Sequence, residues 1–154
     1  MAAPDETAGR QTIWLCRHGN RIDFVDPSWK GDDPHLSEDG IVQAKETGLR
    51  LKGEGIQHIF TSPFLRTIET AHHIAEALDL PIKIEHGASE WLNPEWFSGR
   101  PVHIPLDVLL RRFPRIDGNM NRWLCLSILK VRRKPLSVRV RQVEFWLIPS
   151  AGIC

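Results

Sequence analysis

Short apolar runs alternate with longer amphipathic stretches over the first two thirds of the chain. Residues 12–16, 56–61 and 81–85 are short, apolar and rich in β-favouring side chains, which predicts three strands, the first of them buried. After Ser37 and again after Ser62, apolar residues recur three and four positions apart, which predicts two helices. This alternating order predicts an α/β fold with a mostly parallel sheet and right-handed crossovers.

Capping residues mark the expected ends of the first helix. Ser37 is a suitable N-cap, and Glu38 and Asp39 follow it in the first turn, where negative charge is favourable. Gly53 and Gly55 are expected to end this helix, because glycine adopts the backbone conformations that stop one.

The second helix has the clearest apolar stripe in the sequence. Ser62 and Pro63 are expected to open it, with the proline in the first turn. Arg66 lies in that turn but off the stripe, so it is expected near the carboxyl edge of the sheet. The stripe consists of Phe64, Ile68, Ala71, Ala75 and Leu78.

Two polar stretches read as loops. Residues 21–35 are rich in Asp, Pro and Gly and are expected to form a long loop over the mouth of a site at the sheet edge. Residues 93–105 are rich in Pro and Trp, and a short helix is expected after them over 106–113.

Charged residues are distributed unevenly along the chain. Residues 1–118 hold 13 Lys and Arg against 18 Asp and Glu, whereas residues 119–154 hold 7 against 1. Helical stripes also stop near residue 119. We therefore expect a disordered tail over 1–11, one domain over 12–118, and a basic tail over 119–154 that is not native to the domain.

The overall composition is that of a soluble protein. The chain has 154 residues, 42% of them hydrophobic, and a net charge of +1, which gives no overall nucleic-acid signal. The basic runs at 131–134 and 139–141 have no clean amphipathic period, so a nucleic-acid or membrane patch is the less favoured interpretation. Three scattered cysteines, with no secretory leader and no apolar membrane span, favour a cytoplasmic location.

Two predicted strand ends carry cations to the same edge of the sheet. Arg17 and His18 directly follow the first strand, and Arg66 opens the helix after the second. The carboxyl ends of parallel strands share a crevice lined by helix N-termini, and Arg side chains match phosphate oxygens there. His18 between these cations is an available nucleophile toward phosphorus. The alternative, an Arg and a His that simply close a strand, loses weight once Arg66 is included.

The motifs in this order resemble the histidine phosphatase superfamily, the phosphoglycerate-mutase-like phosphatases. The resemblance covers residues 12 to about 118. It rests on Leu-Cys-Arg-His-Gly-Asn at 15–20, Leu-Ser-Glu-Asp-Gly at 36–40 followed by Gln43 and Ala44, Thr-Ser-Pro at 61–63 with Arg66, Thr70 and Ala71, and Glu90 after the third strand.

The resemblance implies a role for each of five residues. His18 would take the phosphoryl group as a phosphohistidine, Arg17 and Arg66 would hold its oxygens, and Asn20 would add a neutral contact. Glu90 would be the general acid that protonates the leaving oxygen. The scheme needs no metal and no cofactor. For Glu90 a plain surface carboxylate remains an alternative, and Arg21 and Ser62 are at least as easily structural.

Other histidines are expected to do no chemistry. His72 and His73 fall in the middle of a helix and are interpreted as surface or packing residues. The remaining four lack partners that would mark them as ligands: His35, His58, His86 and His103.

The chain departs from the family pattern near its end. The family carries a second pocket histidine, usually as His-Gly after an apolar strand, and this chain has no histidine after His103. The resemblance therefore implies a three-layer, phosphoglycerate-mutase-like fold that is incomplete at its C-terminus.

The expected function is hydrolysis of a small-molecule or protein phosphomonoester, with weak activity because the second histidine is missing. Mutase-type phosphoryl transfer is less favoured. Two alternatives stay open: a non-catalytic phosphate-binding or interaction domain, and an inactive truncated product.

Overall fold

The computed structural model describes residues 11–89, 103–118 and 138–143 of the chain. The chain divides into two compact units, one formed by Met1–Arg17 with Val131–Cys154 and the other by His18–Lys130. Within the described residues, no helix has the length and apolar character needed to cross a membrane.

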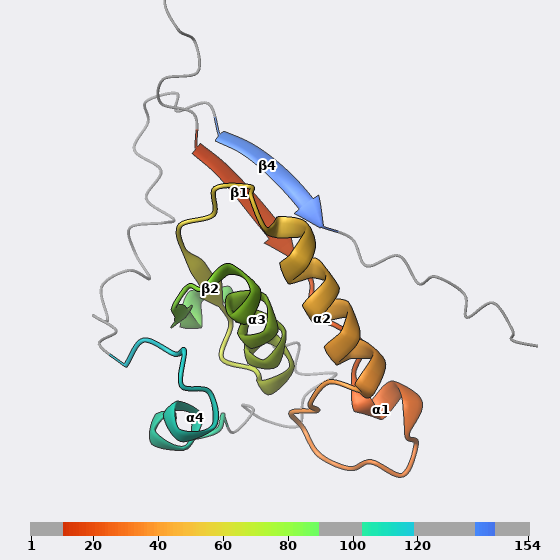
Figure 1. The fold of residues 1–154 in the computed structure, drawn as a ribbon. Coiled ribbons are helices and arrows are strands. Elements are labelled where there is room, and N and C mark those ends of the chain that lie inside the picture. Colours follow the sequence, from red (N-terminus) through yellow and green to blue (C-terminus); the bar gives the residue numbers. More distant parts are fainter. Residues whose placement is uncertain (1–10, 90–102, 119–137, 144–154) are drawn as a thin grey trace, which may run out of the picture. The chain divides into compact units, whose positions relative to one another are not determined.

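The first unit contains a pair of parallel strands. Strand β1, Gln11–Cys16, pairs with β4, Val138–Val143, in a register that places Cys16 opposite Val143 (Figure 1). The guanidinium carbon of Arg141 lies 5.1 Å from the centre of the Trp14 ring. The first strand is thus confirmed, and a strand that the sequence analysis did not expect lies in the basic tail.

One expectation about β1 is wrong. The strand was expected to be buried, but Ile13 is 38% and Leu15 is 54% exposed. The apolar run is too short to distinguish a buried strand from one with exposed apolar side chains, since both carry the same residue types.

The second unit holds the remaining elements (Figure 1). In chain order they are α1 (Ile22–Val25), α2 (Glu38–Leu51), β2 (Ile59–Thr61), α3 (Leu65–Leu78), β3 (Ile82–Ile84), the short 3-10 helix η1 (His86–Ala88) and α4 (Leu106–Arg112). The expected helices and strands are confirmed with small differences at their ends. Helix α1 lies in the stretch that was expected to be loop throughout.

Parallel pairing is also present in the second unit. Strands β2 and β3 pair in parallel, with Thr61 opposite Ile84. On the other side of β3, Ile82 forms a parallel bridge with Ile116. Two backbone hydrogen bonds of 2.8 Å support it: the Ile82 N–H donates to the Arg115 carbonyl oxygen, and the Asp117 N–H donates to the Ile82 carbonyl oxygen. The expected α/β class with parallel strands is confirmed.

Helices α2 and α3 lie side by side because small residues let them approach (Figure 1). A Cβ atom placed on Gly48 of α2 would lie 2.8 Å from the Cβ of Ala77 and 3.1 Å from the Cα of Ile74, both on α3. Helix α2 begins as predicted, with the Ser37 hydroxyl accepting the Gly40 N–H at 3.1 Å.

Helix α3 is the centre of the hydrophobic core. Its apolar face packs with β3, α4 and the segment after α4, through Leu65, Ile68, Ala71, Ala75, Ile82, Ile84, Leu109, Phe113 and Ile116. Phe64 is the N-cap, so Pro63 precedes the helix and does not occupy its first turn as expected. Phe64 has no side-chain cap of its own, so the free N–H groups of this first turn need an acceptor from elsewhere in the chain.

Candidate functional site

The backbone after His18 is hydrogen-bonded to helix α3 through the hydroxyl group of Thr70. The Gly19 N–H donates to Thr70 Oγ1 at 3.1 Å, and the same hydroxyl donates to the Arg66 carbonyl oxygen at 2.8 Å. Thr70 is 4% exposed, so both bonds are shielded from water. The structure therefore brings the His18 backbone to the turn of α3 that carries Arg66, as the sequence analysis expected.

Two glycines let this loop pack against the start of α2. A Cβ atom on Gly19 would lie 2.4 Å from the Gly40 carbonyl oxygen, and one on Gly40 would lie 2.1 Å from the Asn20 carbonyl oxygen. The Ser37 N–H also donates to that Asn20 oxygen at 2.9 Å. Gly19 is thus required by a close approach between backbones.

The His18 ring has a defined proton position. Its Nδ1 lies 2.8 Å from the Gly19 carbonyl oxygen, an atom that can only accept a hydrogen bond. Nδ1 therefore carries the proton, and in the neutral imidazole the lone pair is on Nε2. A neutral imidazole with a fixed Nδ1–H is the state in which Nε2 acts as a nucleophile or a base.

Arg66 is almost fully buried beside a carboxylate. Its side chain is 6% exposed, its Nη1 lies 3.6 Å from Asp33 Oδ1, and its guanidinium carbon lies 4.3 Å from the centre of the Phe64 ring. Burial of an arginine without a nearby anion is costly, so the Asp33 carboxylate stabilises the guanidinium in this position.

Asp33 is a residue that the sequence analysis did not single out. Both of its carboxylate oxygens accept the Leu65 N–H, at 2.9 and 3.0 Å, so Asp33 supplies the cap that Phe64 lacks. The one sequence signal for Asp33 is a helix start that has no capping residue of its own. This signal does not identify the acceptor, because Asp33 is 32 residues away from Leu65 in the chain.

Burial raises the pKa of Asp33 above its usual range. The Leu65 N–H and the Arg66 and His103 charges act in the opposite direction but only offset part of this effect. His103 packs edge-on against Phe64, with ring centres 5.0 Å apart. A histidine that was expected to have no role therefore lies close to the Asp33 and Arg66 pair.

Three further predicted residues have different outcomes. Arg17 is exposed and is the last residue of the first unit. Asn20 is held by hydrogen bonds, because its N–H donates to Gln43 Oε1 at 2.9 Å and its Oδ1 accepts the Arg21 N–H at 3.1 Å. Glu90 lies outside the described residues, so its assignment stays a prediction.

Two residues with open assignments have structural partners. Arg21 forms an ion pair with Asp23 and covers the Phe24 ring. The Ser62 hydroxyl lies 2.8 Å from the Thr67 hydroxyl at the start of α3.

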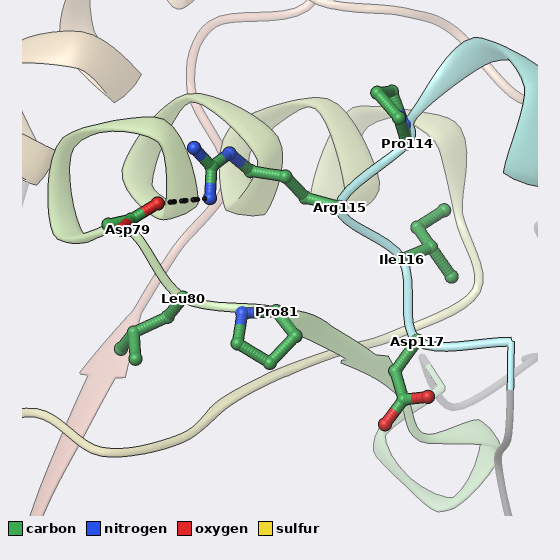
Figure 2. Close-up of a pocket in the computed structure, with 7 residues that line it drawn as sticks. All are labelled: Asp79, Leu80, Pro81, Pro114, Arg115, Ile116 and Asp117. Carbon is green, nitrogen blue, oxygen red and sulfur yellow. Dashed lines mark hydrogen bonds and ion pairs between the residues drawn. The ribbon is translucent and has the colours of Figure 1, made fainter.

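A surface pocket of about 370 Å³ lies elsewhere, beside the start of β3 (Figure 2). Its rim carries the ion pair between Arg115 and Asp79, 2.9 Å apart. None of the predicted site residues lines it. The pocket is therefore unrelated to the group around His18.

Comparison with known proteins supports the motif analysis. The family model described as the histidine phosphatase superfamily (branch 1) matches residues 13–103. The chain is 35% identical over 114 residues to the transcription factor tau 55 kDa subunit of Saccharomyces cerevisiae, an alignment that covers 68% of this chain and 26% of that protein. It is 41% identical to the ubiquitin-associated and SH3 domain-containing protein A of Mus musculus, over 71% of this chain and 24% of that protein. The chain thus spans about a quarter of the length of these curated relatives.

A solved structure shows the same fold. The ecdysone phosphate phosphatase from Bombix mori, in complex with tungstate, superposes with a TM-score of 0.58 at 21% identity, covering 73% of this chain and 56% of that one. At this level of identity the likeness concerns the fold alone. The family match over residues 13–103, together with the motifs around His18 and Arg66, shows that the chain belongs to branch 1 of the histidine phosphatase superfamily.

Proposed function

We propose that this protein hydrolyses phosphomonoesters through a phosphohistidine on His18. The observation that carries the proposal is the 2.8 Å contact between His18 Nδ1 and the Gly19 carbonyl oxygen, which leaves the reactive lone pair on Nε2. Membership of the histidine phosphatase superfamily supports the same chemistry.

The reaction has two steps. His18 Nε2 forms a bond to phosphorus while the phosphorus–oxygen ester bond breaks, and Glu90 gives its proton to the leaving oxygen. Water then attacks the phosphohistidine, loses a proton to the Glu90 carboxylate and releases inorganic phosphate. The histidine returns to its starting state, so the cycle needs no metal and no cofactor.

Cations stabilise the charge on the transferred group. Arg66 supplies a guanidinium at the first turn of α3, and Arg17 and Asn20 flank His18 in the chain. Asp33 acts as a positioning residue in this scheme, because it holds both the Leu65 N–H and the Arg66 guanidinium. The substrate is a small-molecule or protein phosphomonoester in the cytoplasm, and hydrolysis is favoured over mutase-type transfer.

A second function is favoured by the relatives. The carboxylate of Asp33, 3.6 Å from the Arg66 guanidinium, opposes phosphate binding equally in both functions. Two relatives are described as a transcription factor subunit and as an SH3 domain-containing protein. A phosphate-binding or interaction domain without turnover is the alternative.

Hydrolysis of para-nitrophenyl phosphate by the purified chain distinguishes the two functions. The proposal predicts slow turnover that is lost in His18→Ala and kept in a control, His58→Ala, whose histidine is exposed. Phosphate binding by calorimetry that is lost in Arg66→Ala, without any turnover in the wild type, would favour the binding domain. If the wild type showed no turnover and no phosphate binding, both functions would be contradicted.

A further inference from the structure

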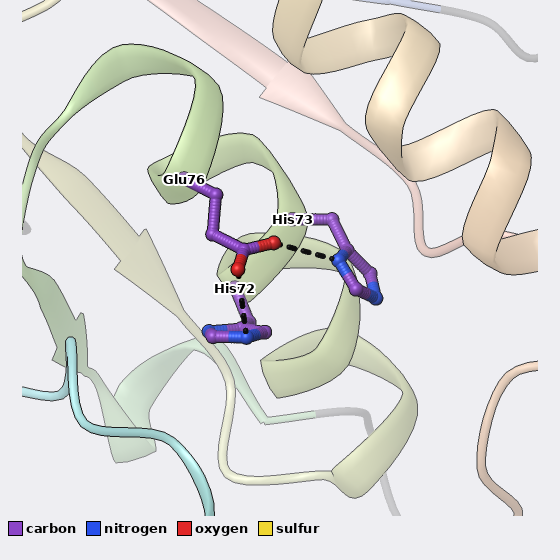
Figure 3. A group of neighbouring side chains, drawn as sticks. All are labelled: His72, His73 and Glu76. Carbon is purple, nitrogen blue, oxygen red and sulfur yellow. Dashed lines mark hydrogen bonds and ion pairs between the residues drawn. The ribbon is translucent and has the colours of Figure 1, made fainter.

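Three side chains on helix α3 form a compact group of metal-ligating atoms (Figure 3). Glu76 lies between two imidazoles, with Oε1 3.6 Å from His72 Nε2 and Oε2 3.0 Å from His73 Nδ1. One ligand atom from each of the three residues lies within 4.8 Å of the others. This grouping follows from the helix, because at about 100° per residue position 76 falls in angle between positions 72 and 73.

One group is ready to bind a cation, and one imidazole must first move a proton. The hydrogen bond with His73 lowers the pKa of Glu76, which favours the ionised carboxylate. Burial lowers the pKa of His72, which favours its neutral ring. Because a carboxylate only accepts hydrogen bonds, His73 Nδ1 carries a proton in its 3.0 Å contact with Glu76, and this proton must leave Nδ1 when an ion binds there.

The packing of α3 holds one of the two imidazoles in place. The His72 ring packs edge-on against Phe113 of the core, with ring centres 5.3 Å apart. Glu76 can adjust by small rotations, since its side chain is 50% exposed, whereas the His73 side chain is 17% exposed, as is that of His72. Ligand atoms in a tetrahedral zinc site are about 3.4 Å apart, given bonds of about 2.0–2.1 Å. The group therefore needs only a small contraction to reach that geometry.

We propose that His72, His73 and Glu76 bind a divalent transition metal ion of the zinc type. Two nitrogens and one carboxylate oxygen suit zinc and its neighbours, whereas calcium and magnesium prefer oxygen ligands alone. Water reaches the fourth position from the side of Glu76, whose side chain is 50% exposed. None of the three residues belongs to the proposed phosphatase chemistry, so the site is independent of it.

Two neighbouring cations oppose a bound metal ion and one carboxylate favours it. Arg115 acts on His72 and Lys45 on Glu76, whereas Glu69 acts on His72 in the opposite direction. Two of these charges are already paired, Arg115 with Asp79 at 2.9 Å and Glu69 with Arg112 at 2.7 Å. A bound ion would link residues 72–76 of the helix that also carries Arg66 and Thr70.

Calorimetric titration of the full chain with zinc chloride tests this site. We expect one bound equivalent, and we expect His73→Gln and Glu76→Gln each to weaken binding by more than the roughly tenfold that loss of an outer-shell partner costs. Neither residue belongs to the hydrophobic core cluster, so the variants should fold. A matched control, His58→Gln, removes an exposed histidine and should leave binding unchanged.

Thermal unfolding gives a second readout, because an ion that binds only the folded state raises the unfolding temperature. Zinc should raise it in the wild type and in His58→Gln but not in Glu76→Gln. The proposal is overturned if the wild type binds no zinc, or if His73→Gln and Glu76→Gln bind it as the wild type does.

Discussion

At the scale of single residues, the group around Arg66 contains two buried side chains of opposite charge, Arg66 and Asp33. The Asp33 carboxylate serves two purposes at once, since it caps α3 through the Leu65 N–H and lies 3.6 Å from the Arg66 guanidinium. Both side chains are shielded from water, at 6% and 12% exposure, so their interaction is not screened as a surface ion pair is.

Asp33→Asn should therefore lower the free energy of unfolding by about 1–3 kcal/mol, because it removes the anion beside a buried cation while keeping an oxygen for the Leu65 N–H. Urea denaturation measures this loss. Inorganic phosphate should restore more stability to the variant than to the wild type, because it offers Arg66 a replacement anion.

Asp107→Asn is the matched control, since Asp107 pairs with Arg111 on an exposed surface of α4. It should change stability by less than about 1 kcal/mol. Equal effects of the two substitutions, or equal stabilisation of both proteins by phosphate, would contradict the role given to Asp33.

His72 makes stability depend on pH. Burial lowers its pKa in the folded state below the ordinary value of 6.5, so below pH 6.5 the unfolded chain binds this proton more readily than the folded one. Stability should fall as the pH is lowered through this range. Between pH 7.5 and 5.5 the wild type should lose more stability than His72→Gln, which cannot be protonated, as measured by urea denaturation. Equal losses would show that His72 does not contribute.

At the scale of elements, the close contact of α2 and α3 fixes the framework around His18. Gly48 allows this contact, because a side chain there would meet Ala77 and the Ile74 backbone. Thr70 then joins α3 to the Gly19 backbone, and Gly40 joins α2 to the same segment.

Gly48→Ala tests the contact between the helices. Alanine favours a helix by about 1 kcal/mol over glycine, but overpacking costs about 1–3 kcal/mol. We expect a net loss of stability in urea denaturation. The adjacent Leu49→Ala, at a side chain that is 63% exposed, should stay within about 0.5 kcal/mol of the wild type. A Gly48→Ala protein as stable as the wild type would show that the helices are not in such close contact.

The elements that the sequence predicts well carry strong local signals. Ser37 with its acidic neighbours marks the start of α2, and the apolar stripe from Phe64 marks α3. Strand β4 was missed although Val and Arg alternate at 138–141 with the two-residue period of a strand. The basic charges in this segment are also typical of a binding surface, and strand pairing between distant segments leaves no local signal.

The candidate site was predictable to a similar extent. His18 and Arg66 follow predicted strands, so their common location could be inferred from the order of elements. Asp33 and Thr70 act through partners 32 and 51 residues away, and no periodicity in the sequence reports such contacts. Gly19 and Gly40 were visible as glycines, but only the structure shows that their backbones touch.

At the scale of the whole molecule, the chain has the fold of its family. Part of the basic tail forms β4 and pairs with β1, and no histidine follows His103 in the sequence. The assignment of residues 119–154 as foreign to the domain stays a prediction. Weak turnover stays a prediction from the resemblance, because no residue after His103 in this sequence matches the family's second histidine.

The central claim is that His18 becomes phosphorylated. The most direct measurement is to incubate the full chain with a radiolabelled phosphomonoester, quench it, and test the protein-bound label for stability in acid and in alkali. We predict label on the wild type that is lost in acid and kept in alkali, and none on His18→Ala. Absence of label on a wild type that hydrolyses the ester, or equal label on His18→Ala, would contradict the claim.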